Sequence, residues 1–346
     1  MKKLNRALVI LLFIYLDSSG CTSMSMDCAK LEDFCVGLVT EVGRRDDRAY
    51  NQAAWEGILQ AKSDGVADWT ATIETMDSRD YDDNIRVFAE ANYDVIVTVG
   101  TDSNEATYTA AGQYPNINFI GADQRQSENL NRLTNLAWLV FPEDQLGFLA
   151  GALAAEMTKS GRVGAVCGSD AWLPMKSYGE GFIAGALFID PDVKVTTTYH
   201  NDVGLDETFT DPMWGTAIAN SLVAEGADII FGVGGTTGSD AIVAAVMGNA
   251  FGIGVDIDEH YTLPSAAPRL YTSVVKLIAP SVTGLIKAAK EAQIQTSVFP
   301  AGNYLGQVGL APYHAMASSI PDDVKMRMSD LVVTLRSGEV QTGAAR

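Results

Sequence analysis

Short apolar runs alternate with longer segments of helical periodicity along most of the chain, and this alternation predicts an α/β protein. Strands that alternate with helices form parallel sheets with both faces covered. In the first half, the expected strands are Val36–Thr40, Trp69–Thr75, Val95–Val99, Asn118–Ile120 and Leu136–Val140. The expected helices are Tyr50–Ser63, Asp83–Ala91, Ala106–Gln113 and Gln145–Thr158.

A second series of the same kind follows the first. Its expected strands are Arg162–Val166, Val193–Tyr199, Asp228–Phe231 and Phe251–Val255. Its expected helices are Tyr178–Phe188, Thr216–Glu225 and Ser239–Met247. Two such series imply two lobes with a sheet each, and we predict lobe 1 at residues 35–155 and lobe 2 at residues 156–269.

The last part of the chain returns to strands, at Leu270–Val275 and Asn303–Val308, with a helix at Ser281–Gln293 between them. Late elements of this kind indicate that residues 270–346 cross between the lobes more than once and complete lobe 1. Such crossings make a hinge and leave a cleft between the lobes. An apolar run within the tail has no assigned type, and the tail's last residues, from Gly338, are expected to be frayed.

The charge of the chain excludes several classes of partner. Its formal net charge is −19, from 24 basic and 43 acidic side chains. Nucleic-acid binding and docking on anionic lipid both need clustered basic residues, so neither is expected. Hydrophobic residues make up 47% of the chain, which is enough for a large core.

Residues 1–20 have the features of a secretion signal. Basic residues precede an apolar run at 7–16, and small residues lead into Cys21. The run is too short to span a bilayer as a helix. One interpretation is a lipoprotein, with a lipid on Cys21 that tethers an arm at residues 21–34 to the extracytoplasmic face of the membrane. The other is an ordinary cleaved signal, and Ser18, where a lipobox usually has Leu, leaves that alternative open.

The remaining cysteines and the histidines carry little chemistry. Cys28 and Cys35 flank the start of the first strand and can form a disulfide in an oxidising compartment. Cys167 lies in an expected strand and is interpreted as a small core residue. The three histidines are scattered without metal-ligand spacing, so we expect no metal and no cofactor.

Acidic, aromatic and amide side chains follow the first strand closely, as Asp46, Asp47, Tyr50 and Asn51. Open α/β sheets bind their ligands where strands end. These groups can hydrogen-bond hydroxyls and stack on a ring. The stretch has neither the Ser/His pairing of a hydrolase nor the glycine spacing of a phosphate loop.

The chain resembles the basic membrane protein (BMP) family of solute receptors, lipoproteins that feed nucleosides to ABC transporters. The resemblance covers about Cys35 to His314 and rests on blocks that occur in the family's order: 46–57, 92–100, 114–123, 141–151, 178–185, 225–238, 254–258 and 272–276. It implies a type I periplasmic-binding-protein fold, with two Rossmann-like lobes and parallel sheets joined by a multi-strand hinge. It also implies an ABC permease as partner. The best-known receptors of this kind hold a purine base between two aromatic rings.

The resemblance places ligand-stacking rings at Tyr50 and Tyr178, where the family usually has Phe. The alternative for both is packing in the core. Asp47 and Asn51 flank the first ring, and their alternative role is helix capping. We favour Asn51 as a site residue and Asp46 as the cap.

In the family, an acid and a lysine that match Asp256 and Lys276 hold the ribose hydroxyls. Their alternative role is a structural ion pair. Asp123 ends a strand and is a candidate base contact, or else part of a turn. Gly234 and Gly235 let backbone amides approach a ligand, or else form a tight turn. Thr101 and Asp102 follow another strand end and are candidates similar to Asp123, while Trp172, Trp214 and Asp258 are weaker ones.

The sequence therefore predicts a monomeric, lipid-anchored receptor of an ABC importer that binds a nucleoside, with a purine favoured, and catalyses nothing. A sensor of a sugar or another small solute on the same fold is an alternative. A nucleoside hydrolase is disfavoured, because the acids are spread over both lobes and no nucleophile elbow is present.

Overall fold

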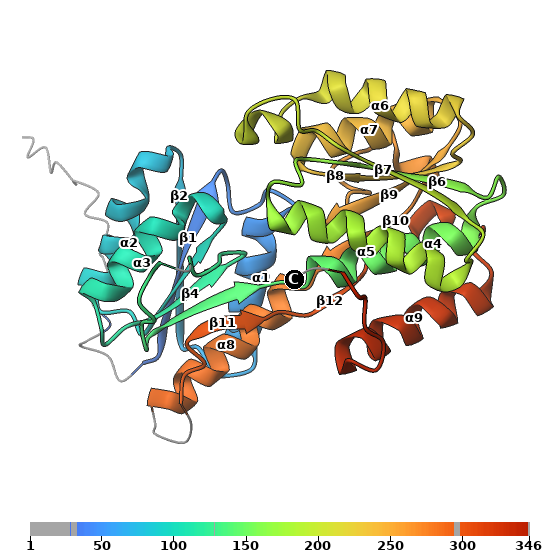
Figure 1. Ribbon diagram of the computed structural model, residues 1–346. Helices are drawn as coiled ribbons and strands as arrows, with labels where there is room; N and C mark the ends of the chain where they lie inside the picture. The colour runs from blue at the N-terminus through green and yellow to red at the C-terminus, as the bar shows by residue number, and fades with distance from the viewer. Residues whose placement is uncertain (1–27, 29–32, 128, 294–297, 345–346) are drawn as a thin grey trace, which may run out of the picture.

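A computed structural model of the protein describes residues 28, 33–127, 129–293 and 298–344. The expected signal at residues 1–20 and the lipid attachment at Cys21 lie outside these residues. The described chain forms two α/β lobes that lie side by side and are joined by strands and loops between them (Figure 1). None of its helices is both long and apolar enough to cross a bilayer.

Lobe 1 is built on a six-stranded sheet with the order β11-β5-β4-β3-β1-β2. The strands are β1 (Cys35–Val42), β2 (Trp69–Thr75), β3 (Val95–Val99), β4 (Asn118–Ala122), β5 (Leu136–Val140) and β11 (Gly302–Leu305). All neighbouring pairs are parallel. The strand β3 is buried along its whole length, as its unbroken β-branched sequence indicates, because helices cover both faces of the sheet.

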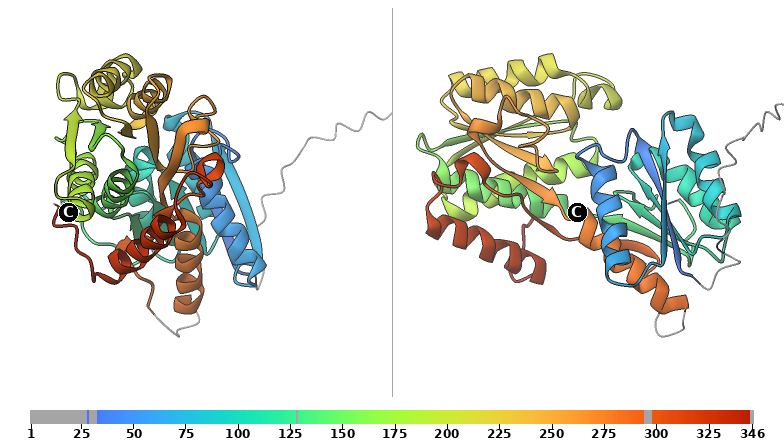
Figure 2. Two further views of the ribbon diagram at one scale, coloured as in Figure 1. Left: turned by 90° about the vertical axis from the view of Figure 1, so that its right-hand side faces the viewer. Right: turned by 180° about the vertical axis from the view of Figure 1, so that it is seen from behind.

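Two pairs of helices cover the sheet of lobe 1. On one face lie α1 (Tyr50–Ser63) and α8 (Ile278–Gln293), which pack side by side (Figure 2). On the other face lie α2 (Tyr81–Glu90) and α3 (Asn104–Gln113). Successive residues of β1 point to opposite layers: Leu38 joins the core under α1, and Val39 joins the core under α2.

Lobe 2 repeats this arrangement, with the strand order β12-β10-β9-β8-β6-β7. The strands are β6 (Arg162–Cys167), β7 (Lys194–Tyr199), β8 (Ile229–Val233), β9 (Phe251–Asp256), β10 (Leu270–Lys276) and β12 (Val308–Leu310). Only the short edge strand β12 runs antiparallel to its neighbour, β10. One face carries α6 (Pro212–Ala224) and α7 (Gly235–Met247), and the other carries α4 (Glu143–Met157) and α5 (Leu173–Ile189).

The helices α4 and α5 cross at backbone contact. A Cβ atom added at Gly181 or Gly185 of α5 would overlap the carbonyl oxygen of Asp144 or Phe148, respectively, on α4. A Cβ atom added at Gly147 or Gly151 of α4 would likewise overlap a carbonyl oxygen of α5. These glycines come from two of the sequence blocks that resemble the BMP family. The close crossing sets the position of α5, whose first turns face lobe 1.

The described chain passes between the lobes three times: from β5 to α4, from β10 to α8, and from β11 to β12. The first crossing follows Phe141, because α4 packs on α5 and β10 in lobe 2. The expected boundary after residue 155 therefore lies too late in the chain. The expected single strand Asn303–Val308 is also wrong, because it divides into β11 and β12, one in each sheet.

The tail differs from the expectation of a frayed end. An additional helix, α9 (Asp322–Ser337), contains the apolar run that had no assigned type and packs on α4. Gly338 ends this helix in a left-handed conformation. Beyond it, the buried Thr342 donates a hydrogen bond of 2.6 Å from its Oγ1 to the carboxylate of Asp144.

The N-terminal cysteines are joined: Cys28 and Cys35 form a disulfide at the start of β1. Cys167 is free and buried in β6, and burial raises the pKa of its thiol to about 12. The short 3₁₀ segments are Ser78–Asp80, Thr101–Ser103, Leu205–Phe209, Ala267–Arg269 and His314–Met316.

Candidate functional site

Strand ends from both sheets meet at a cavity of about 180 Å³ between the lobes. Parallel strands place their carboxyl ends at one edge of a sheet, and here the two edges face each other. The lining residues are Glu41, Tyr50, Gly100, Thr101, Asp123, Trp172, Pro174, Met175, Tyr178, Phe209, Gly234, Gly235, Asp256 and Lys276. Seven of them are site residues expected from the sequence: Tyr50, Asp123, Tyr178, Gly234, Gly235, Asp256 and Lys276.

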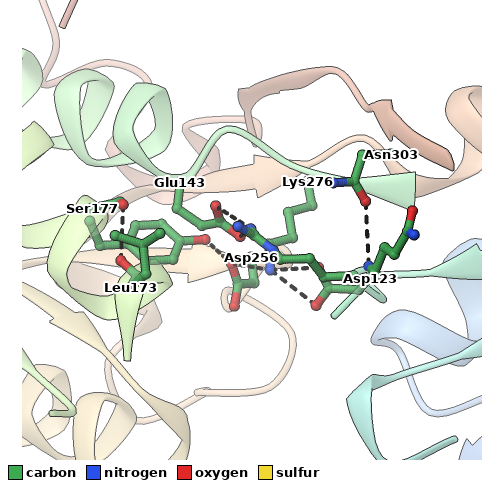
Figure 3. Close-up of polar contacts among 10 residues, drawn as sticks. Asp123, Glu143, Leu173, Ser177, Asp256, Lys276 and Asn303 are labelled. Carbon is green, nitrogen blue, oxygen red and sulfur yellow. Dashed lines mark hydrogen bonds and ion pairs between the residues drawn. The ribbon is translucent and has the colours of Figure 1, made fainter. Parts of the chain in front are cut away.

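Lys276, the last residue of β10, lies between two carboxylates (Figure 3). Its Nζ is 2.9 and 3.0 Å from the two oxygens of Asp123 and 3.6 Å from Asp256. Burial alone would lower the pKa of Lys276, but the nearby carboxylates of Asp123, Asp256 and Glu143 outweigh it and raise the pKa. The ammonium therefore stays charged although its side chain is only 7% exposed.

Asp256 is held from both lobes. The Tyr178 hydroxyl, on α5, donates a hydrogen bond to its Oδ1. Tyr50, at the start of α1 in lobe 1, lines the same cavity as Asp256, and burial together with the charge of Asp256 raises the pKa of its phenol well above the usual value. The ammonium of Lys276 is 5.6 Å from the centre of the Tyr50 ring, within cation–π range. One acid, one cation and two phenols therefore converge at this end of the cavity.

Tyr178 does not present its ring to the cavity. The side chain is only 1% exposed, and its ring packs 6.2 Å from that of Phe231 in the core of lobe 2. The alternative of core packing therefore holds for the ring, while the hydroxyl reaches Asp256. The other aromatic side chains of lobe 2 that border the cavity are Trp172 and Phe209, in an edge-to-face pair with centroids 5.4 Å apart.

Phe209 was missed by the sequence reasoning, although its surroundings contain a signal. It lies just before Asp211, whose side chain accepts from the backbone N–H of Trp214 and caps α6, with Pro212 in the first turn. A residue between a strand end and a helix cap lies at the ligand edge of the sheet. Trp214 does not line the cavity; its ring stacks on His200 at 4.1 Å.

Asp47 and Asn51 do not border the cavity. The Asp47 carboxylate accepts from the backbone N–H groups of Ala49, Asn51 and Gln52, so it caps the start of α1. The side chain of Asn51 accepts from the N–H of Glu41 and donates to its carbonyl oxygen. The structure thus places Asp47 at the cap, where Asp46 was expected; Asp46 instead pairs with Arg44.

Glu41, at the end of β1, is the second lining residue that was missed. Burial raises its pKa to about 7, with further increases from Asp102, Asp123 and Asp47. Asn51 holds its backbone, and Gly100 leaves room for its side chain, because a Cβ there would lie 2.6 Å from the carboxylate. A carboxyl with this pKa can either donate or accept a hydrogen bond near neutral pH.

Gly234 and Gly235 form the turn from β8 into α7, with φ angles of 109° and 59°. A Cβ at Gly234 would lie 2.9 Å from the backbone nitrogen of Gly168. Both the left-handed backbone and the close approach require glycine here. The turn therefore places backbone without side chains at the wall of the cavity.

Two larger cavities adjoin the central one. An outer cavity of about 1070 Å³ shares Thr101, Asp123, Trp172, Phe209 and Lys276 with it and extends past Asp102 and Arg125. Another, of about 630 Å³, lies beside α1 and is bordered by Asp258; Asp256 and Lys276 separate it from the central cavity. The central cavity is therefore the narrow middle of a longer interlobe cleft. No cluster of metal ligands occurs among the described residues.

Two α/β lobes, three crossings and a cavity at facing strand ends define the type I periplasmic-binding-protein fold. The particular family follows from the sequence. A family model described as "ABC transporter substrate-binding protein PnrA-like" (Bmp) matches residues 34–305, and the chain belongs to this family.

Individual relatives are more distant. A CD4+ T-cell-stimulating antigen of Listeria innocua is 28% identical over 232 residues, which are 66% of this chain and 62% of the relative. An ABC transporter nucleoside-binding protein, BmpA, of Lactococcus lactis is 26% identical over 242 residues, 66% of this chain and 65% of the relative. The matched part is thus less than two thirds of either relative. An ABC transporter solute-binding protein from Conexibacter woesei has a TM-score of 0.68 at 24% identity, covering 89% of this chain and 97% of that structure.

Proposed function

We propose that this protein binds a purine nucleoside in the interlobe cleft and delivers it to an ABC permease. The observation that carries the proposal is that one cavity is lined by aromatic rings and by a charged acid–lysine pair. Aromatic rings from both lobes, Tyr50 and Phe209, border one cavity that also holds the acid–lysine pair Asp256 and Lys276. A flat base with an attached diol needs this combination: π faces for the base, and a charged acceptor and donor for the hydroxyls.

In this proposal, Asp256 accepts from the ribose diol and Lys276 donates to it. Glu41 and Thr101 hydrogen-bond the edge of the base, and Trp172 supports the Phe209 ring. The turn at Gly234 allows close backbone contact. Three residues act indirectly in this proposal. Tyr178 orients Asp256, whereas Asp47 and Asn51 hold the loop that carries Glu41 and Tyr50.

The nucleoside assignment also draws support from the name of the Lactococcus lactis relative, a nucleoside-binding protein. Anchoring to the extracytoplasmic membrane face through a lipid on Cys21, and partnership with a permease, belong to the same proposal. Family membership supports a role in binding rather than catalysis.

The test is calorimetric titration with guanosine, inosine and adenosine, and with free ribose and free purine bases as controls. We expect nucleosides to bind and ribose alone to bind far more weakly, because ribose lacks the stacked base. Tyr50→Ala should weaken nucleoside binding by about 1–3 kcal/mol, the range for a stacked base. Phe188→Ala is the matched control, because this ring is 56% exposed on α5 and does not border the cavity.

Two results would contradict the proposal. Binding of free sugars with no nucleoside binding would favour the sugar receptor instead. Equal nucleoside affinity in Tyr50→Ala and the unmutated protein would remove the stacking role of Tyr50.

A further inference from the structure

The carboxyl group of Glu41 is fixed in place at the cavity, yet its own hydrogen bonds are not used by the protein. Glu41 lies near the end of β1 and lines the central cavity. The side chain of Asn51 holds its backbone through both the N–H and the carbonyl oxygen. Gly100 lies directly beside the carboxyl, where a larger residue would overlap it. Among the residues that the structure describes, none hydrogen-bonds this carboxyl or forms an ion pair with it.

The electrostatic surroundings of Glu41 disfavour a negative charge. The groups that interact with its carboxyl are acids and phenols from α1, α2 and the loops after β1, β3 and β4: Asp47, Asp102, Asp123, Tyr50 and Tyr81. The ammonium of Lys276 is taken by the carboxylates of Asp123 and Asp256 (Figure 3). Burial and the like charges around it raise the pKa of Glu41 to about 7. The carboxyl is therefore present in both protonation states near neutral pH.

The two protonation states of a carboxyl group match different purine edges. A protonated carboxyl has an O–H donor beside a carbonyl acceptor, whereas a carboxylate has two acceptors. Adenine presents an acceptor, N1, beside the donor of its 6-amino group, which is complementary to the protonated carboxyl. Guanine presents two neighbouring donors, N1–H and its 2-amino group, which are complementary to the carboxylate. In either mismatched combination a polar group of the site is left without its hydrogen bond, and this weakens binding.

We propose that Glu41 selects between purine nucleosides through its proton: the protonated carboxyl takes adenosine, and the carboxylate takes guanosine. The inference rests on the proposed function, in which Glu41 hydrogen-bonds the edge of the base. It adds a rule for specificity, because the cleft then favours adenosine on the acid side of neutral pH and guanosine on the alkaline side. Asn51 and Gly100 serve as positioning residues, since they keep the carboxyl at the cavity wall in both states.

The experiment measures the Kd of adenosine and of guanosine for the protein by calorimetric titration at about pH 5.5 and about pH 8. The ratio of the two Kd values isolates the contact with the base, because both nucleosides carry the same ribose and both bases stay uncharged in this range. We expect the ratio to shift toward guanosine by about tenfold or more between the two pH values, because a complementary pair of hydrogen bonds is exchanged for a mismatched one.

Glu41→Gln fixes the hydrogen-bonding pattern of the protonated state, because an amide has donors beside an acceptor at every pH. This variant should favour adenosine throughout, with a ratio that does not change with pH. Glu259→Gln is the matched control: burial raises the pKa of Glu259 to about 7 as well, but this residue does not line the cavity. The control should keep the pH-dependent ratio of the unmutated protein. Circular dichroism checks folding, and Glu41→Met, which is also uncharged and should also give a constant ratio, replaces Glu41→Gln if that variant does not fold.

The outcomes separate this inference from the proposed function. Nucleoside binding with a ratio that stays constant with pH would overturn the selection by Glu41 and leave the proposed function in place. A pH-dependent ratio that persists in Glu41→Gln would also overturn it, because another group would then select the base. Absence of nucleoside binding at both pH values would refute the proposed function, and the selection rule with it.

Discussion

The two lobes present chemically different walls to one cavity, although their sheets have the same order. Lobe 1 ends β1 with Glu41 and follows β4 with Asp123, so its wall is acidic. Lobe 2 lines the opposite side with Trp172, Met175 and Phe209 and adds the charged pair Asp256 and Lys276 from the ends of β9 and β10, so its wall combines apolar and charged groups. The fold repeats the positions at the strand ends, but the side chains placed there differ: lobe 1 contributes the acids Glu41 and Asp123, and lobe 2 contributes an acid–lysine pair beside apolar side chains.

The lobes also differ in how their helices pack. In lobe 2, four glycines let α4 and α5 cross at backbone distance. Gly185→Ala would force a methyl group onto the carbonyl oxygen of Phe148, and we expect it to cost about 3 kcal/mol of unfolding free energy. Gly284→Ala, in α8 of lobe 1, is the control, because no atom lies within 4 Å of the added Cβ.

The control should leave stability unchanged or raise it by about 0.5–1 kcal/mol through helix propensity. Urea unfolding of both variants is the measurement. Equal effects at the two positions would mean that the α4–α5 crossing accommodates the added methyl group.

A second comparison separates the two aromatic side chains of lobe 2. Phe209→Ala should weaken nucleoside binding by about 1–3 kcal/mol, because it removes a ring that borders the cavity. Tyr178→Phe should weaken binding by less, about 1 kcal/mol, because the ring stays in the core and only the hydrogen bond to Asp256 is lost. Calorimetric titration of both variants with the same nucleoside measures the two losses of affinity. The reverse order of effects would mean that the Tyr178 hydroxyl, through its hydrogen bond to Asp256, contributes more to binding than the Phe209 ring.

The last expected effect is a pH dependence at Glu41, in the wall that lobe 1 contributes. The pKa of Glu41 is about 7 in the folded protein, against an ordinary value of 4.5. Between these values the folded state binds more protons than the unfolded state, so the Glu41 contribution to stability falls as pH rises from about 4.5 to 7. Glu41→Gln should remove this loss, so the variant should gain stability over the unmutated protein as pH rises from 4.5 to 8, by up to about 3 kcal/mol for the full pKa shift.

Thermal melts of both proteins from pH 4 to 8 check this expectation. Glu259 gives the comparison within lobe 2. Burial raises its pKa to about 7 as well, but its carboxylate accepts from Ser239 and from the backbone of Val255. The Glu41→Gln variant should therefore retain the part of the slope that Glu259 causes. An unchanged slope would mean that Glu41 stays ionised in the folded protein.

Most elements of the fold could be predicted from the sequence, because the apolar periods are strong and local. The expected helix Tyr50–Ser63 and strand Val95–Val99 match α1 and β3 residue for residue. The errors lie where tertiary contacts decide. Nothing local shows that Gly306 and Gln307 separate β11 from β12, or that α4 belongs with lobe 2, because both depend on which sheet the chain reaches after a crossing.

The candidate site divides in the same way. Family-like blocks and strand ends led to Tyr50, Asp256 and Lys276, because polar residues after buried strands collect at the ligand edge. Glu41 and Phe209 were missed, since the first is one acid among many and the second belongs to a loop whose path is not local.

The sequence by itself determined the strands and helices, the two series of them, and the residue types at the strand ends. Only the tertiary structure decided which groups the side chains at each strand end contact. It turned the Tyr178 ring into the core, used Asp47 and Asn51 to hold a loop, and set Asp123 and Asp256 on either side of Lys276. The physical reason is that hydrophobic period and capping act within a few residues, whereas burial and charge pairing here join residues more than 100 positions apart.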